Sequence, residues 1–378
     1  MKIALLTDGI YPYVVGGIQK HSYYLAKYLA RNKIYVELYH TAPIDPGDLK
    51  CFTDVERKFI SSIFIEYPSL VRFPGHYLIE QIFYSKLIFQ KLLLSKGIDF
   101  IYAQGLTGLK AIEHKTKINV PIGVNLHGLE MFQKTPNLIS KVKSFYFKYH
   151  VKYILKNSDL VFSLGKKLTE ILIELKVPKE KIIELPIGIG EDWIINPVQK
   201  IENEIFTFLF VGRYERRKGI EELNEAILRF SERKELMFLF VGDIPENLKC
   251  KFQNVHYLGK ISDQDELKKI YKKSDVLICP SHAEGMPTVI LEAMASGLAI
   301  IASDVGAVGE LVDSTNGVLM DKANRENIEK AILFLIDLEK EKLNCMKFIS
   351  LEKVNVNFRW EVVIKNLFNR IKNECKAI

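Results

Sequence analysis

The chain has 378 residues, 48% hydrophobic and 26% charged, which is enough for two domains of ordinary size. No stretch approaches the roughly 18 uncharged apolar residues of a membrane span, and the five scattered cysteines lack metal-site spacing, so we expect free thiols in a reducing, cytoplasmic compartment. Residues 1–195 carry 26 Lys and Arg against 18 Asp and Glu, whereas the remainder carries 27 against 28. The basic first half suits an anionic partner or consists of solvated lysines on helix faces.

The first half of the sequence alternates strands with helices. KIALLTD at 2–8 predicts a strand, because Asp8 ends the apolar run too early for a secretory signal. IQKHSYYLAKYLARN at 18–32 predicts a helix, and IYVELYH at 34–40 a second strand. Further strands are expected in DFIYAQG, VPIGVNLHG and DLVFSLG. Apolar strands that alternate with helices indicate a parallel sheet covered on both faces.

The second half starts the same pattern again. FTFLFVG at 206–212 is followed by the helical IEELNEAILRFSER and by LMFLFVG at 236–242, with NVHYLG, DVLICPS and AIIASD beyond. We therefore predict two Rossmann-like domains, 1–195 and 200–355, joined by a polar linker near 192–204. Residues 356–378 form an expected terminal amphipathic helix.

The first half has two candidate ligand-binding sites, one at the end of a loop and one at the end of a strand. Gly16 and Gly17 close the loop before the first helix and would let a ligand approach its start, although a lone Gly-Gly pair is a weak signal. His127 follows the strand PIGVNL and could contact a sugar hydroxyl or polarise a developing charge. A structural histidine is the alternative, and the missing G-x-G-x-x-G motif disfavours a dehydrogenase or epimerase.

Two helical segments of the first half are candidates for a membrane or acceptor surface. In 140–159, Lys141, Lys148 and Lys152 could lie on a membrane with Phe145 and Tyr149 inserted, but a domain helix with core aromatics is favoured. The segment 76–95 is more apolar and could be a buried helix or part of an acceptor wall.

Cations follow the first strand of the second half. Gly212 and Arg213 come directly after it, and Lys218 ends the turn RYERRK. Ligands bind outside the carboxyl ends of such strands, so Arg213 and Lys218 could neutralise a diphosphate. Arg216 and Arg217 are interpreted as parts of a solvated turn.

Asp263 and Asp265 resemble a D-x-D metal motif, but Ser262 as a helix N-cap with acidic first-turn residues accounts for them. We therefore predict no metal requirement and no cofactor.

The most informative stretch is HAEGMPTVILEAMASG at 282–297. Pro287 suits the first turn of a helix, and Gly297 suits its end. The free amides near Thr288 and Val289 would favour phosphate. Glu284 before this helix and Glu292 inside it could read the hydroxyls of a sugar nucleotide.

Together these motifs resemble the retaining glycosyltransferases of family four, which have the GT-B fold, two Rossmann-like domains facing each other across a cleft. The resemblance rests on VGGIQKH, LHG, VGRYERRKG, the E-x7-E pair in 282–297 and the ending FRWEVVIKNLF. This ending resembles the family's terminal helix, so the resemblance implies that 356–378 packs back on the first domain. It implies that Arg213 and Lys218 hold the donor diphosphate, that Glu292 binds the ribose, and that Glu284 and His127 contact the sugar. The remaining donor-binding positions it implies are Gly16, Gly17, Gly212, Gly259, Ile261, Gly285, Met286, Pro287, Thr288 and Val289.

The resemblance is imperfect in its loops. Ile187 and Gly190 stand where many members have Asn and Asp, and Ala307 and Gly309 depart from the usual G-G-x-P motif. These departures weaken the prediction of which donor is bound more than the prediction of glycosyltransferase activity.

We expect a metal-independent hexosyltransferase that moves a hexose-like sugar from a UDP or GDP donor, with retention, to a glycan, lipid-linked or phosphorylated acceptor in surface-polysaccharide assembly. We expect a cytoplasmic protein that attaches peripherally to an anionic membrane through its basic first domain. We expect no nucleic-acid partner. The alternatives are a non-catalytic glycan-binding or scaffold protein of this fold, and a transferase acting on a small soluble acceptor.

Overall fold

The computed structural model describes residues 1–14, 16–42, 49–71, 73, 75–133, 138–195 and 205–377, with the backbone alone at 138–145 and 373–377. The contacts between residues divide the chain into two compact units. The first unit comprises Met1–Phe132, Asn137–Gly188 and Trp360–Ile378, and the second comprises Gln133–Pro136 and Ile189–Arg359. The linker predicted near 192–204 lies largely outside the described residues.

The first unit is built on a parallel sheet, which has seven strands among the described residues, in the order β3-β2-β1-β4-β5-β6-β7. They are β1 (Lys2–Leu6), β2 (Tyr35–His40), β3 (Ile60–Phe64), β4 (Phe100–Gln104), β5 (Ile122–Asn125), β6 (Leu160–Ser163) and β7 (Ile182–Glu184). The central strand β4 is buried along its whole length, as expected for a sheet covered on both faces.

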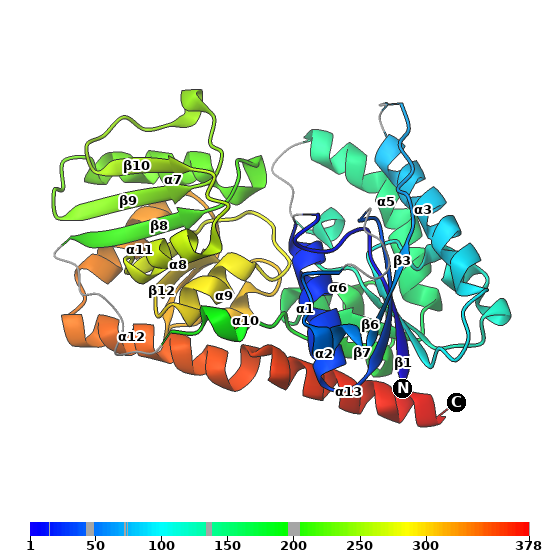
Figure 1. Ribbon diagram of the computed structural model, residues 1–378. Coiled ribbons are helices and arrows are strands. Elements are labelled where there is room, and N and C mark those ends of the chain that lie inside the picture. Colours follow the sequence, from blue (N-terminus) through cyan, green and yellow to red (C-terminus); the bar gives the residue numbers. More distant parts are fainter. Residues whose placement is uncertain are drawn as a thin grey trace. The chain divides into compact units, whose positions relative to one another are not determined.

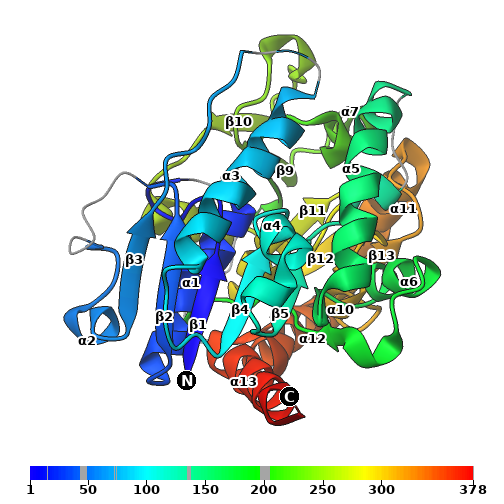
Figure 2. The same ribbon diagram turned by 90° about the vertical axis from the view of Figure 1, so that its right-hand side faces the viewer.

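Helices cover both faces of this sheet. They are α1 (Gly17–Arg31), α2 (Asp54–Arg57), α3 (His76–Leu92), α4 (Leu109–Glu113), α5 (Leu138–Asn157), α6 (Lys167–Glu174) and α13 (Trp360–Ala377). Helices α3, α4 and α5 lie on one face (Figure 2), where α4 contacts both of its neighbours. Helix α1 lies on the other face and contacts α13 (Figure 1).

The terminal helix α13 is anchored by its first residue. Trp360 is fully buried, and its ring stacks on Tyr24 and Tyr28 of α1 with centroids 5.9 and 6.1 Å apart. A Cβ at Gly188 would lie 2.7 Å from the Trp360 ring, so only glycine leaves the indole this space. The helix expected from residue 356 therefore starts at Trp360, after a π-helical turn over Val354–Phe358.

The second unit repeats the architecture with a parallel sheet in the order β10-β9-β8-β11-β12-β13. Its strands are β8 (Phe206–Val211), β9 (Leu236–Val241), β10 (Val255–Gly259), β11 (Val276–Cys279), β12 (Ala299–Ser303) and β13 (Gly317–Met320). Its helices are α7 (Ile220–Ile227), α8 (Gln264–Lys272), α9 (Thr288–Ala295), α10 (Val308–Leu311), α11 (Arg325–Ile336) and α12 (Lys340–Lys353). The predicted class, α/β with two Rossmann-like sheets, is confirmed.

The core of the second unit explains why alternating aromatic residues form β8 and β9. Phe208 and Phe238 stack with ring centroids 5.1 Å apart, and Phe210 lies 5.6 Å from Phe240. These residues pack with the apolar faces of α7 and α11 in one buried cluster. Burial of such a side chain contributes about 1.5–3 kcal/mol, so this face positions β8 and the loop that follows it.

In both sheets the strand order reverses beside the first strand, between β1 and β4 and between β8 and β11. Ligands of doubly wound sheets bind at the carboxyl ends of strands at such a reversal. Within the described part of the chain, no helix is both long and apolar enough to cross a membrane.

Candidate functional site

Two loops meet at the carboxyl end of the second sheet, because β8 and β11 are neighbours. One loop, 212–219, follows β8, and the other, 280–287, follows β11. The His282 amide donates to the Arg217 carbonyl at 2.7 Å. Gly219 has φ +70°, and a Cβ there would lie 1.9 Å from the Pro280 carbonyl oxygen. Glycine is therefore required where the two loops touch.

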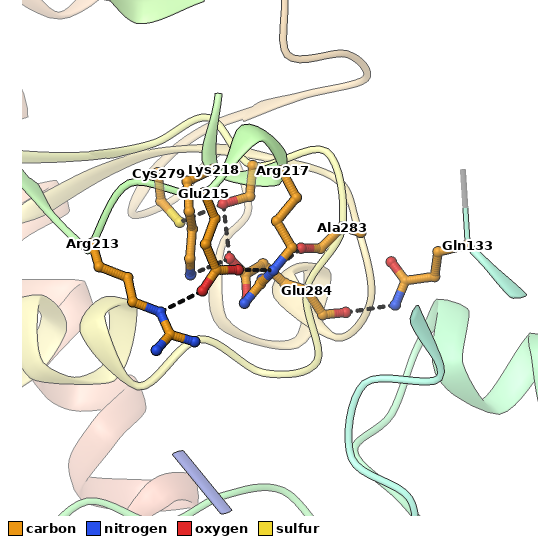
Figure 3. Close-up of polar contacts among 9 residues, drawn as sticks. Gln133, Arg213, Glu215, Arg217, Lys218, Cys279, Ala283 and Glu284 are labelled. Atoms are coloured by element: carbon orange, nitrogen blue, oxygen red, sulfur yellow. Dashed lines mark hydrogen bonds and ion pairs between the residues drawn. The ribbon is translucent and has the colours of Figure 1, made fainter. Parts of the chain in front are cut away.

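Side chains of alternating charge connect these loops (Figure 3). Arg213 Nε donates to one oxygen of Glu215 at 2.5 Å, and Arg217 Nε donates to the other at 2.7 Å. Arg217 Nη1 then donates to Glu284 Oε2 at 3.1 Å, and Lys218 Nζ donates to Glu284 Oε1 at 2.6 Å. We call these five residues the charge chain.

The charge chain carries a net positive charge. Burial alone would raise the pKa of Glu215, but the charge of Arg217 and the hydrogen bond from Arg213 lower it below its ordinary value, so Glu215 is ionised at neutral pH. Glu284 is only 6% exposed and accepts a further hydrogen bond from Ser281 Oγ at 2.8 Å. Three cations face two carboxylates, an arrangement suited to an anionic ligand.

The structure corrects the interpretation of one arginine. Arg217 was expected to be solvated, yet its guanidinium joins Glu215 to Glu284 and also donates to the Ala283 carbonyl at 3.1 Å. Arg216 instead pairs with Glu222 at 2.6 Å on the outer side of the turn. The sequence RYERRK does not show which arginine turns inward, because that depends on the 3-10 turn Arg216–Lys218 and on the loop packed against it.

Helix α9 begins beside the charge chain. Pro287, predicted in the first turn, is instead its N-cap, and Thr288 and Val289 form the first helical turn. The helix ends at Ala295, and Gly297 beyond it has φ +66°. Met286 is buried, and Gly285 accepts a backbone hydrogen bond from Ala307.

The second glutamate of the E-x7-E pair lies in a more enclosed position. Glu292 is 3% exposed, and Oε2 accepts a hydrogen bond from the buried Tyr271 hydroxyl at 3.1 Å. Tyr271 comes from α8 and packs edge-on against Trp193, with ring centroids 5.6 Å apart. Sequence reasoning did not find Tyr271, because a tyrosine inside an otherwise lysine-rich helix carries no local signal.

The remaining predicted donor positions of the second unit lie at strand ends. Gly212 follows β8, and its amide donates to the Val241 carbonyl. Gly259 ends β10 with φ +70°, and a Cβ there would meet nothing within 4 Å. Ile261 is half-buried two residues further on.

The D-x-D segment is a helix cap, with one correction. Asp263, rather than the predicted Ser262, is the N-cap of α8, and its Oδ1 accepts hydrogen bonds from the amides of Asp265 and Glu266.

In the first unit, Gly16 and Gly17 stand at the start of α1. Gly16 is the N-cap, and a Cβ there would lie 2.1 Å from Gln19 Oε1. Gln19 in turn donates to Asp8 at 2.7 Å. Gly17 opens the helix, and a Cβ there would meet nothing within 4 Å. Space for a ligand therefore exists at Gly17 rather than at Gly16.

His127 is held by a neutral hydrogen-bond network at the carboxyl ends of β4 and β5. Its backbone has φ +56°, and its amide donates to the Asn125 side chain at 2.9 Å. Its Nε2 lies 2.5 Å from Gln104 Oε1, while Gln104 Nε2 lies 2.9 Å from His21 Nδ1. Sequence reasoning missed Gln104 and His21, although Gln104 also ends a predicted strand.

Burial lowers the pKa of His127 to about 4 and that of His21 well below its ordinary value. Both rings are thus neutral at pH 7. His127 can exchange hydrogen bonds with a ligand, but it brings no positive charge to it.

Known proteins resemble both halves of the chain. The family model described as Glycosyltransferase Family 4 matches residues 15–193, and the model described as Glycosyl transferases group 1 matches residues 191–349. An uncharacterized glycosyltransferase of Methanocaldococcus jannaschii is 30% identical over 355 residues, which cover 90% of each chain.

Solved structures share the fold at lower identity. Sucrose-phosphate synthase from Thermosynechococcus elongatus has a TM-score of 0.82 and 20% identity over 100% of both chains. Anabaena HepE, solved in complex with UDP and glucose, has a TM-score of 0.71 and 17% identity over 99% of this chain and 100% of its own.

The two Rossmann-like units and these structural neighbours define the GT-B fold. The chain belongs to the glycosyltransferase family described by these two models, Glycosyltransferase Family 4 and Glycosyl transferases group 1. The predicted family is therefore confirmed.

Proposed function

We propose that this glycosyltransferase moves a hexose-like sugar from a UDP or GDP donor to a glycan or lipid-linked acceptor, with retention and without a metal ion. The charge chain is the observation that supports the donor. Arg213 and Lys218 would bind the diphosphate, together with the amides at the start of α9. Glu284 would read the sugar hydroxyls and Glu292 the ribose. In the first unit, Gly17 and His127 remain candidates for contact with the donor.

Negative charge grows on the diphosphate as the sugar departs. Cations held in advance stabilise such charge, and removing one donor of this kind typically costs about 10²–10³-fold in turnover. Arg213 and Lys218 of the charge chain can do this without Mg²⁺.

We also propose that the reaction proceeds with retention and without a covalent intermediate on Glu284. Its carboxylate is held by Lys218, Arg217 and Ser281, an arrangement that suits hydroxyl recognition better than nucleophilic attack. We propose that a leaving phosphate oxygen accepts the acceptor's proton while the acceptor attacks from the same face.

The test of this function combines a screen and a product analysis. A thermal-shift screen of UDP, GDP and their sugars comes first, followed by a transfer assay in EDTA and NMR of the anomeric proton. We expect a retained configuration at full rate in EDTA. An inverted product would contradict the mechanism, and a metal-dependent rate would contradict the metal-free proposal. A chain that binds donors but neither transfers nor hydrolyses them would be a non-catalytic relative.

A surface of α3 supports a membrane-bound acceptor, and we propose peripheral attachment to the cytoplasmic face of an anionic membrane. Ile79, Phe83 and Leu87 recur along one side of the helix and are 38–48% exposed, with the more exposed Leu94 beyond its end. Lys86, Lys91 and Lys96 are exposed in the same stretch. The one carboxylate of the described residues 75–97, Glu80, is buried and accepts a hydrogen bond from the Leu70 amide. An apolar stripe flanked only by lysines suits anionic lipid.

Flotation with vesicles containing phosphatidylglycerol tests this attachment. We expect binding that Phe83→Glu reduces severalfold, whereas Phe334→Glu, an exposed phenylalanine on α11, leaves it unchanged. Equal binding of both variants, or none by the unaltered chain, would contradict the membrane proposal but leave the donor proposal intact.

A further inference from the structure

Arg217 lies in the middle of the charge chain and donates three hydrogen bonds to three different acceptors. Its Nε donates to Glu215, and its Nη1 donates both to the Glu284 carboxylate and to the Ala283 carbonyl. Its side chain is 24% exposed, against 78% for Arg213. Arg217 is therefore built into the junction of the two loops, whereas Arg213 extends into solvent (Figure 3).

Lys218 has two proposed partners, the Glu284 carboxylate and the donor diphosphate. It is the nearest cation to Glu284, at 2.6 Å, and is also a proposed ligand of the donor diphosphate. When a diphosphate draws Lys218 toward itself, Glu284 loses its shorter ion pair while remaining 6% exposed. A buried carboxylate that loses its ion-pair partner either strongly destabilises the folded chain or moves to another partner. Arg217, bound to the second oxygen of Glu284, prevents both the destabilisation and the movement of this carboxylate.

We propose, on the basis of the proposed function, that Arg217 is a positioning residue that keeps the Glu284 carboxylate oriented toward the sugar while Lys218 binds the diphosphate. The planar guanidinium suits this task, because it bonds a carboxylate and a carbonyl in fixed directions. Glu215 holds the far side of Arg217 and orients it. Arg217 acts through Glu284 and does not itself contact the diphosphate.

A matched pair of variants isolates this role. Arg217→Met removes the bridge, and Arg216→Met removes the neighbouring arginine, which pairs with Glu222 instead. For Arg217→Met we expect kcat to fall about 100-fold, the loss typical of a misplaced reacting group. The dissociation constant of UDP, measured by calorimetry, should change less than about threefold, the size of a minor electrostatic effect. Arg216→Met should match the unaltered chain in both.

Arg217→Lys keeps the positive charge but removes the planar guanidinium and its paired N–H donors. We expect kcat to fall about tenfold, the loss equivalent to one hydrogen bond to a charged group. This variant also covers the case in which Arg217→Met does not fold. In a Glu284→Gln background, Arg217→Met should cost nothing further, because residues that act through one group are non-additive.

The outcomes separate the possibilities. Equal kcat for Arg217→Met and Arg216→Met, or full additivity with Glu284→Gln, would overturn the positioning role. A loss of UDP affinity as large as that of Arg213→Ala would make Arg217 a diphosphate ligand and also overturn it. If the unaltered chain binds no nucleoside diphosphate, the proposed function itself fails, and this inference fails with it.

Discussion

The two units present different chemistry at the carboxyl ends of their parallel sheets. At the carboxyl end of β8, the second unit gathers three cations and two carboxylates within hydrogen-bonding distance of one another. At the carboxyl ends of β4 and β5, the first unit gathers His127, Gln104 and His21, all neutral at pH 7. One edge is therefore charged and the other is neutral. The fold supplies the location, and the side chains decide the ligand.

The largest expected effect comes from the charged edge. Lys218→Ala should lower turnover about 10²–10³-fold, because it removes a cation from the diphosphate and from Glu284 at once. Steady-state kinetics with the donor found in the screen would measure this. Lys249→Ala is the control, since Lys249 pairs with the exposed Glu246 and lies over the Tyr257 ring, and neither residue belongs to the charge chain. A loss smaller than threefold would remove Lys218 from the site.

The neutral edge should behave differently. His127→Ala should lower kcat about tenfold, the value of a lost hydrogen bond, with no change in the UDP dissociation constant. His76→Ala, on the same unit, should change neither. Should His127→Ala weaken UDP binding as much as Lys218→Ala does, the two edges would not differ in the way proposed.

The smallest effect is a pH dependence of stability that originates in the first unit. Burial lowers the pKa of His40 and of His127 from 6.5 to about 4. The unfolded chain therefore binds more protons than the folded chain between pH 6.5 and 4. The free energy of unfolding should fall as the pH falls through this window and level off below it.

Urea unfolding at a series of pH values measures this dependence. We expect His127→Gln to flatten the fall, and His256→Gln, an exposed histidine of the second unit, to leave it as it is. An identical slope in His127→Gln would show that His127 is not buried in the neutral form.

Local patterns in the sequence predict much of this molecule. The aromatic alternation in FTFLFVG and LMFLFVG predicts two neighbouring strands, and these are β8 and β9. Pro287 and Gly297 bracket α9 because their backbone preferences are intrinsic. The predicted cations Arg213 and Lys218 lie in the charge chain, since a residue that follows a parallel strand reaches the ligand edge of the sheet. The catalytic and binding roles of these residues stay predictions.

Other features depend on partners that are distant in the sequence. Lys218 and Arg217 meet a glutamate 66 and 67 positions away, and Gln104 meets a histidine 83 positions away. Whether an arginine is solvated or bridging depends on which loop packs against its turn. A sequence read locally contains no such information.

The sequence by itself therefore determined the α/β class, the strand edges and the presence of cations and glutamates there, because periodicity and backbone preference act over a few residues. Only the tertiary structure decided that Arg217 joins the charge chain, that Asp263 caps α8, and that His127 is neutral. Those properties arise from burial and from ion pairs between loops, and both exist only after the strands have paired.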